Sequence, residues 1–287
     1  MEKTVLVTGA TGTIGRDVVK ILSENGVPVR AGVRDQAKGR KQFGIDVKLA
    51  RFDFEDAVSF PDTLKGVEKV FLLPPLMPTQ VEATNAFVDA AKRAGIRHIV
   101  KLSAIGADTD APYTFGKWHA IGERHVRESG LAFTFLRPNS FMQNFMTYFP
   151  PREGVIYLPW GNGKASFVDT RDIAAVAADA LTSDGHEGKT YTLTGPTAFG
   201  IAEVASILSE VAGREIKYVD VPESAARDGM LQAGLPQWQV EGLMELHAAN
   251  KQNRWSAVTS DIEEVIGKPA ITFAQFARDH AETFRAS

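Results

Sequence analysis

Three glycines near the start of the chain have the spacing of a phosphate-binding turn. Gly9, Gly12 and Gly15 follow an apolar, β-branched run that predicts a buried strand, and they precede a helical pattern. In such a turn, Gly9 lets the chain leave the strand sharply, Gly12 lets backbone approach a pyrophosphate, and Gly15 lets the helix pack closely. Phosphates would bind the free N–H groups at the positive end of the helix dipole. The motif predicts a dinucleotide site formed by Gly9, Ala10, Thr11, Gly12, Thr13, Ile14 and Gly15.

Arg34 stands at the end of the second predicted strand, residues 27–33, where the side chain selects the cofactor. An acidic residue there binds the ribose 2′-OH of NAD, whereas arginine accommodates the 2′-phosphate of NADP. Arg34 therefore favours NADP(H), and Lys38, one helical turn further on, would add a second cation. Asp35 follows directly, so NAD(H) binding at weaker affinity stays open. The alternative is that Arg34 is a solvated surface residue.

Asp53 and Phe54 follow the third predicted strand, residues 47–52, at the place where adenine would lie. We expect Asp53 to hydrogen-bond the base and Phe54 to flank it. The alternative is that Asp53 caps the next short helix.

A proline-rich loop follows the fourth predicted strand, residues 69–73. Because the prolines cannot join a strand ladder, the loop is extended and apolar, and it places Leu73 and Pro74 beside the nicotinamide. Pro75 and Leu76 then become candidate walls of an apolar substrate site. The alternative is a stiff connector.

The elements that would position these residues alternate between strand and helix, at intervals of about 20–30 residues. Further strands are expected at 98–103, 132–137 and 189–194. This pattern predicts an α/β fold with a Rossmann-type, doubly wound parallel sheet and a smaller, mostly helical C-terminal lobe. Residues 1–150 would form the NADP-binding core. Residues 151–287 would return a strand and helices to that core and build the smaller substrate lobe.

The segment that follows the sixth predicted strand is rich in aromatic residues, among them Phe141 and Phe145. These two are candidate substrate contacts. The alternative is that the aromatic side chains form the core of the smaller lobe.

Composition narrows the function classes. The net charge of the 287 residues is −3, which argues against a nucleic-acid partner. No apolar run has the length of a membrane span, and no basic segment followed by a signal-peptide core is present, so we expect a cytoplasmic protein. The absence of cysteine excludes disulfides, thiol catalysis and cysteine-ligated metals, and the 6 histidines lack ligand spacing. We therefore expect no metal site.

Five stretches together carry a family resemblance: residues 8–15, 33–34, 102–104, 129–138 and 168–174. They resemble the NmrA-like branch of the atypical short-chain dehydrogenases/reductases. This resemblance implies a Rossmann fold that binds NADP(H). The branch contains NADPH-dependent reductases of quinones, azo dyes and triphenylmethane dyes, as well as redox sensors without catalytic activity.

Short-chain reductases use a Tyr-x-x-x-Lys pair, in which the tyrosine donates a proton and the lysine lowers its pKa. Tyr113 and Lys117 have this spacing. The family register, counted back from Glu123, instead places Phe115 and His119 at the two positions. On a helix the two pairs lie about 200° apart, and the apolar residues lie on the His119 side. We interpret Tyr113 and Lys117 as part of a solvated polar face, with the ordinary short-chain mechanism as the alternative.

His119 and Ser103 are the remaining candidates for catalysis and cofactor contact. The register puts His119 near the cofactor ribose, and Ser103 ends a predicted strand where it would hydrogen-bond the nicotinamide or the substrate. The alternatives are a core histidine with its hydrogen bonds satisfied and a serine that caps a turn.

Two functions fit this set of residues. The first is a flavin-free reductase that passes hydride from NADPH to a flat conjugated acceptor, such as a quinone or an azo compound, which needs no tyrosine because its protons can come from water. The second is a sensor that responds to NADP(H) occupancy and acts through a protein partner. Exposure of the aromatic segment as a surface patch would favour the sensor.

Overall fold

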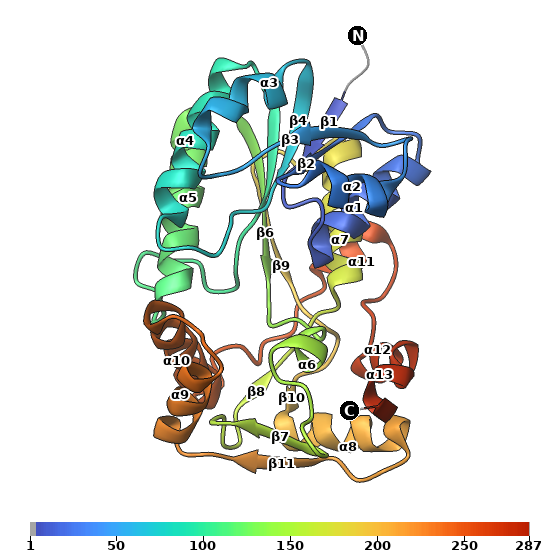
Figure 1. The fold of residues 1–287 in the computed structure, drawn as a ribbon, viewed down its shortest axis with the longest axis vertical. Coiled ribbons are helices and arrows are strands. Elements are labelled where there is room, and N and C mark those ends of the chain that lie inside the picture. Colours follow the sequence, from blue (N-terminus) through green and yellow to red (C-terminus); the bar gives the residue numbers. More distant parts are fainter. Residues whose placement is uncertain (1–3, 287) are drawn as a thin grey trace. The chain divides into compact units, whose positions relative to one another are not determined.

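The computed structural model describes residues 4–286, which form two compact units (Figure 1). Residues 4–109, 117–137 and 173–191 form the first unit, and residues 110–116, 138–172 and 192–286 form the second. The chain thus passes between the units repeatedly and does not divide once at residue 150. Part of the region after residue 151 does return to the first unit, as expected.

The first unit is organised around a seven-stranded sheet with the order β3-β2-β1-β4-β5-β6-β9. Neighbours from β3 to β6 pair in parallel. The order changes direction between β1 and β4, which in open α/β sheets marks the crevice where ligands bind. The predicted Rossmann-type parallel sheet is therefore confirmed. Its strands are β1 (Thr4–Val7), β2 (Val29–Val33), β3 (Lys48–Arg51), β4 (Val67–Leu72), β5 (His98–Leu102), β6 (Ala132–Pro138) and β9 (Lys189–Leu193).

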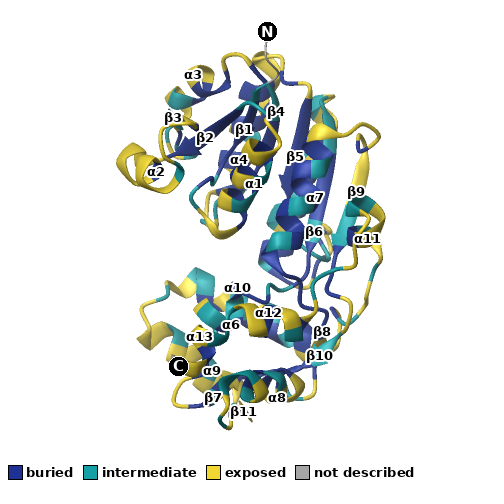
Figure 2. Ribbon diagram, turned by 90° about the vertical axis from the view of Figure 1, so that its right-hand side faces the viewer, coloured by how far each residue is buried: buried dark blue, intermediate teal, exposed yellow. Residues whose placement is uncertain are grey.

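Helices cover both faces of this sheet, with α4 and α5 on one side and α1 and α7 on the other (Figure 1). Every residue of β2 and β5 is buried, as expected of parallel strands covered on both faces (Figure 2). The helices of this region are α1 (Thr13–Glu24), α2 (Gln36–Phe43), α3 (Phe60–Leu64), α4 (Gln80–Arg93), α5 (Thr114–Ser129) and α7 (Thr170–Thr182), with a 3₁₀ turn at Ala57–Ser59.

The second unit contains helices and two small sheets. One sheet pairs β7 with β11 in parallel, and the other pairs β8 with β10 in antiparallel. The mostly helical character of this part is thus confirmed. Its elements are α6 (Asn144–Thr147), β7 (Val155–Leu158), β8 (Lys164–Ala165), β10 (Phe199–Gly200), α8 (Ile201–Ala212), β11 (Lys217–Asp220), α9 (Glu223–Gln232), α10 (Gln237–Lys251), α11 (Asp261–Ile266), α12 (Phe273–Asp279) and α13 (Ala281–Ala286).

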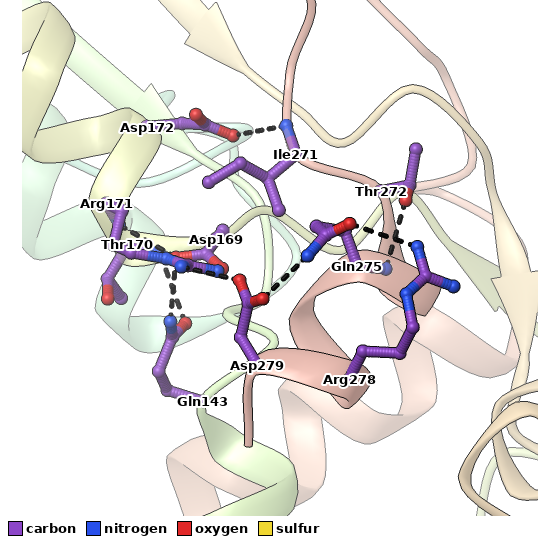
Figure 3. A network of polar contacts seen from close by, with 10 residues as sticks. All are labelled: Gln143, Asp169, Thr170, Arg171, Asp172, Ile271, Thr272, Gln275, Arg278 and Asp279. Carbon is purple, nitrogen blue, oxygen red and sulfur yellow. Dashed lines mark hydrogen bonds and ion pairs between the residues drawn. The ribbon is translucent and has the colours of Figure 1, made fainter. Parts of the chain in front are cut away.

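A buried carboxylate, Asp169, organises the polar interior of the second unit (Figure 3). Arg171 holds it with Nε 3.0 Å from Oδ1 and Nη2 2.7 Å from Oδ2, and its Nη1 also reaches Asp279 Oδ2 at 2.7 Å. These hydrogen bonds raise the pKa of Arg171 above its ordinary value. Gln143 Nε2 donates to the same carboxylate at 2.8 Å. The segment around residue 169 that carried the family resemblance is thus a structural junction.

Asp172 makes a second junction in this network (Figure 3). Its Oδ2 accepts from the backbone N–H of Ile271 at 2.8 Å, which ties the first turn of α7 to the segment before α12. Burial raises the pKa of Asp172 to about 6. Within residues 4–286, no helix is both long enough and apolar enough to cross a membrane.

Candidate functional site

The turn after β1 has the geometry that its glycines predicted. Gly9 has a φ of +59°, a conformation that residues with a Cβ rarely adopt. A Cβ on Gly15 would come 2.2 Å from the carbonyl oxygen of Gly9, so only glycine lets the first turn of α1 pack this closely. The strand, turn and helix therefore have the tight arrangement of a dinucleotide-binding unit.

The N-terminus of α1 is open to an anion. The N-cap residue Gly12 has no side chain to bond the first N–H groups, and the first turn contains no acidic residue. Gly12 and Thr13 are exposed. The helix therefore presents backbone donors and the positive end of its dipole without a built-in carboxylate to neutralise them. A phosphate group is the ligand that such an end binds well.

Arg34 and Lys38 are both exposed, directly after β2 and in the first turn of α2. Because β1 pairs with β2 in parallel, the carboxyl ends of the two strands, and so the glycine turn and Arg34, lie at the same edge of the sheet. Asp35 is occupied differently. Its Oδ1 accepts from the backbone N–H of Lys38 at 3.0 Å and so caps α2. A carboxylate engaged in a cap is less available to a ribose hydroxyl, whereas both cations are open to solvent.

Asp53 and Phe54 follow β3 and are both half-buried. Asp53 Oδ1 accepts from the backbone N–H of Glu55 at 3.1 Å, which closes a turn ahead of the 3₁₀ helix. The position that flanks this helix is Asp56, so Asp53 does not cap it. The ring of Phe54 packs edge-on against Phe52, with centroids 4.8 Å apart. Both residues keep surface that an adenine ring could contact, and that role stays a prediction.

Thr8 joins the ends of β1 and β4 at the point where the strand order changes direction. Its hydroxyl donates to the carbonyl of Phe71 at 3.1 Å and accepts from the N–H of Leu73 at 2.8 Å. The proline-rich loop that follows is apolar and extended, as predicted, with Pro74 buried, Pro75 half-buried and Leu76 exposed. A ligand at this edge would therefore meet Leu73 and the loop. Their cofactor and substrate contacts stay predictions.

Ser103 follows β5 and bonds a buried carboxylate. Its hydroxyl donates to Glu123 Oε1 at 2.6 Å. Arg137 grips the same carboxylate with both nitrogens, Nε at 2.9 Å from Oε1 and Nη2 at 2.6 Å from Oε2. A serine hydroxyl has one hydrogen, so this bond leaves Ser103 its lone pairs as acceptors. Ser103 can thus accept from an amide N–H while Glu123 keeps it oriented.

Lys101 is a functional candidate that sequence reasoning missed. Its side chain is buried within β5, and its Nζ lies 3.3 Å from Nδ1 of His119 on α5. Gly122 leaves room for it, because a Cβ there would come 3.2 Å from Lys101 Cε. Burial lowers the pKa of Lys101 to about 8, so the ammonium form still predominates at pH 7. The available signal was a lysine inside an otherwise apolar strand.

This contact determines the tautomer of His119. An ammonium group only donates, so Nδ1 accepts and the ring hydrogen is carried by Nε2. Burial, together with the charge of Lys101, holds the pKa of His119 well below its ordinary value, so the ring is neutral at pH 7. His119 is half-buried. It therefore has the properties of a neutral donor at the edge of the site, which agrees with its predicted role near the cofactor.

A family model and several relatives match this chain over nearly its whole length. The model of the NmrA-like family matches residues 1–273. The chain belongs to the NmrA-like family. An NAD(P)H azoreductase of Xenophilus azovorans is 42% identical over 285 residues, which cover 99% of this chain and 100% of the relative. The resemblance found in the sequence is therefore confirmed.

Solved structures of the NmrA-like fold agree with this assignment. An NADPH-dependent quinone oxidoreductase from Escherichia coli, in complex with NADPH, superposes with a TM-score of 0.87 at 27% identity, covering 96% of this chain and 99% of its own. A triphenylmethane reductase from Citrobacter sp. superposes with a TM-score of 0.86 at 26% identity, covering 97% and 99%.

The expected solvated position of Tyr113 is wrong. Tyr113 is buried, and its ring packs edge-on against Trp255 with centroids 5.6 Å apart. The helix α5 begins at Thr114, so helical rotation does not place Tyr113, and its side chain enters the core of the second unit. Lys117 is exposed, as expected. Phe115 is buried against Gly242, where a Cβ would come 2.4 Å from its ring.

The two aromatic substrate candidates differ in exposure. Phe145 is fully buried, and its ring packs against Phe149, Phe167 and Phe273. It is thus a core residue of the second unit, which is the alternative that the sequence left open. Phe141 is half-buried and stays a candidate contact. In residues 4–286, no cluster of histidine and acidic side chains has the grouping of a metal site.

Proposed function

We propose that this NmrA-like protein is a flavin-free reductase that transfers hydride from NADPH to a flat conjugated acceptor, a quinone or an azo compound. The observation that carries the proposal is the uncapped, acid-free N-terminus of α1, at the same sheet edge as the exposed Arg34. An anion-binding helix end accepts a pyrophosphate, and a free arginine at the end of β2 accepts a 2′-phosphate.

The relatives support the same cofactor and substrate class. The E. coli quinone oxidoreductase and the Citrobacter reductase were both solved with NADP(H). The 42% identical relative is an NAD(P)H azoreductase. NADP(H) is therefore the proposed cofactor, with NAD(H) bound more weakly. A cytoplasmic location and the absence of a nucleic-acid partner stay predictions.

The residues around the proposed nicotinamide position suit hydride transfer by alignment. NADPH supplies the hydride, and each two-electron reduction of a quinone to a hydroquinone takes up two hydrogens, one as hydride and one as a proton from water. Ser103 accepts from the carboxamide, and His119 donates from Nε2 to the ribose or to the developing oxyanion of the acceptor. A neutral donor of this kind stabilises charge that is already delocalised, and alignment of the two rings provides most of the acceleration.

The proposal is tested with a panel of electron acceptors. Purified protein should oxidise NADPH with quinones and azo dyes, without added flavin, and its kcat/KM for aliphatic ketones should be at least about 100-fold lower, because a simple alkoxide needs a stronger proton donor than this site contains. Absorbance at 340 nm follows the reaction, and protein with NADPH but no acceptor is the control. Tight NADPH binding without turnover of any acceptor would favour the sensor. Efficient alcohol oxidation would contradict both functions.

Replacement of Tyr113 by phenylalanine tests the mechanism. The buried ring of Tyr113 packs against Trp255, and phenylalanine preserves that packing. We therefore expect kcat for quinone reduction to change less than about fivefold, whereas loss of a proton-donating tyrosine costs about 100-fold or more. Stopped assays with saturating NADPH give kcat directly. A collapse of kcat with unchanged NADPH affinity would restore the tyrosine-dependent mechanism.

A further inference from the structure

The second unit contains a pocket of about 470 Å³. Apolar and aromatic side chains from α9, α10, β7 and the loop after α6 line it, among them Phe149, Tyr157, Leu158, Val221, Met230 and Leu243. This volume lies within the range of small-molecule sites. All the lining residues belong to the second unit, so the pocket is a property of that unit alone.

One wall of the pocket is a helix that has no core of its own to fill. None of the residues of α9 is buried, although the face that lines the pocket carries Ala225, Ala226, Gly229, Met230 and Ala233. A Cβ added to Gly229 would meet no atom within 4 Å. Small residues and a flexible methionine therefore leave open apolar space, which α9 and α10 enclose side by side in Figure 1.

His247, on α10, is a polar member of this wall with a fixed orientation. Its side chain is 4% exposed, and Trp160 Nε1 donates to its Nδ1 at 2.7 Å. An indole N–H can only donate, so Nδ1 is the acceptor and the ring hydrogen is on Nε2. Burial lowers the pKa of His247 to about 4, which keeps the ring neutral at pH 7. No residue of the described chain accepts this Nε2–H, and Trp160 does not line the pocket, so the Nε2 edge is the one that a ligand can reach.

We propose that this pocket binds the aromatic ring system of a neutral quinone, and that His247 Nε2–H donates a hydrogen bond to one of its carbonyl oxygens. The apolar walls recognise the rings, and one buried donor recognises the oxygen. A ligand without an acceptor atom would leave the donor unpaired, so the pocket selects aromatic carbonyl compounds over plain hydrocarbons. The identity of the ligand as the molecule that is reduced rests on the proposed function, whereas its binding does not.

Two substitutions separate the walls from the donor. Gly229→Leu places a side chain in the pocket, where it meets no backbone, and Ser224→Leu adds the same side chain to an exposed position of α9 outside the pocket. His247→Asn keeps an acceptor for Trp160 near Nδ1 but removes the donor at Nε2, whereas His247→Gln places an N–H donor near Nε2. Menadione is the probe, and its Kd without NADPH is measured by calorimetry. The Kd for NADPH and the KM for menadione are measured in parallel.

We expect Gly229→Leu to weaken menadione binding more than tenfold and Ser224→Leu to leave it unchanged. His247→Asn should weaken it about three- to tenfold, which is the contribution of one hydrogen bond, and His247→Gln should recover part of the loss. The Kd for NADPH should stay within twofold in all four variants. Circular dichroism checks that each variant is folded.

Equal menadione affinity in Gly229→Leu and Ser224→Leu, or no saturable binding to the wild type, would overturn the assignment. The proposed function can fail separately. Turnover of menadione that no variant alters would leave the reductase standing and remove the pocket, whereas binding that Gly229→Leu abolishes, without any NADPH oxidation, would keep the pocket and remove the reductase.

Discussion

Replacement of Arg34 by alanine should weaken NADPH binding about 10- to 100-fold and leave NADH binding nearly unchanged. A charge-assisted contact to the 2′-phosphate contributes roughly 1.5–3 kcal/mol, and NADH has no phosphate at that position. Arg34 is exposed, and Asp35 is engaged in capping α2. The guanidinium is therefore free to bind a ligand without breaking a structural contact. Fluorescence titration of both cofactors measures the two affinities.

Two neighbouring lysines show whether position or charge alone matters. Lys38→Ala, in the first turn of α2, should weaken NADPH binding less than Arg34→Ala, because an ammonium group binds phosphate with one point of contact. Lys41→Ala, in the last turn of the same helix, should have no effect beyond about twofold, the size expected from a screened surface charge. Equal weakening of NADPH and NADH in Arg34→Ala would refute the assignment of the 2′-phosphate site.

Replacement of Arg171 by alanine should lower the free energy of unfolding by about 2–3 kcal/mol. Removal of one partner from a buried ion pair usually costs more, but the side chain of Arg171 is 38% exposed, so we expect the lower part of that range. Asp169 has no exposed surface and would keep only Gln143 and a backbone N–H as donors. Urea unfolding followed by circular dichroism measures the change.

Arg278→Ala is the matched control for this experiment. Arg278 is exposed on α12 and donates only to Gln275 Oε1 within the network of Figure 3, so its loss should change stability by less than about 0.5 kcal/mol. Arg171→Lys should fall between the two, since lysine keeps the charge but loses the two-pronged contact with Asp169. Equal stability of Arg171→Ala and Arg278→Ala would mean that the buried carboxylate does not depend on its arginine.

Long-range contacts decided several features that local patterns could not. The pattern predicted one amphipathic helix over residues 273–284, but the helix breaks at His280 into α12 and α13. Tyr113 has the spacing of a catalytic tyrosine, yet its ring belongs to a core with Trp255, which is more than a hundred residues away in the chain. Local periodicity carries no information about partners so distant in the sequence.

The sequence by itself determined the parallel sheet, the glycine turn and the cation after β2, because each depends on neighbouring residues. Buried strands need runs of apolar residues, a sharp turn with a close helix needs glycine, and a strand end reaches the ligand edge in any such sheet. Only the tertiary structure decided the pairing of Lys101 with His119 and of Trp160 with His247. Each pairing joins residues from different elements, and the tautomer of each histidine follows from the partner that packing brings to its Nδ1.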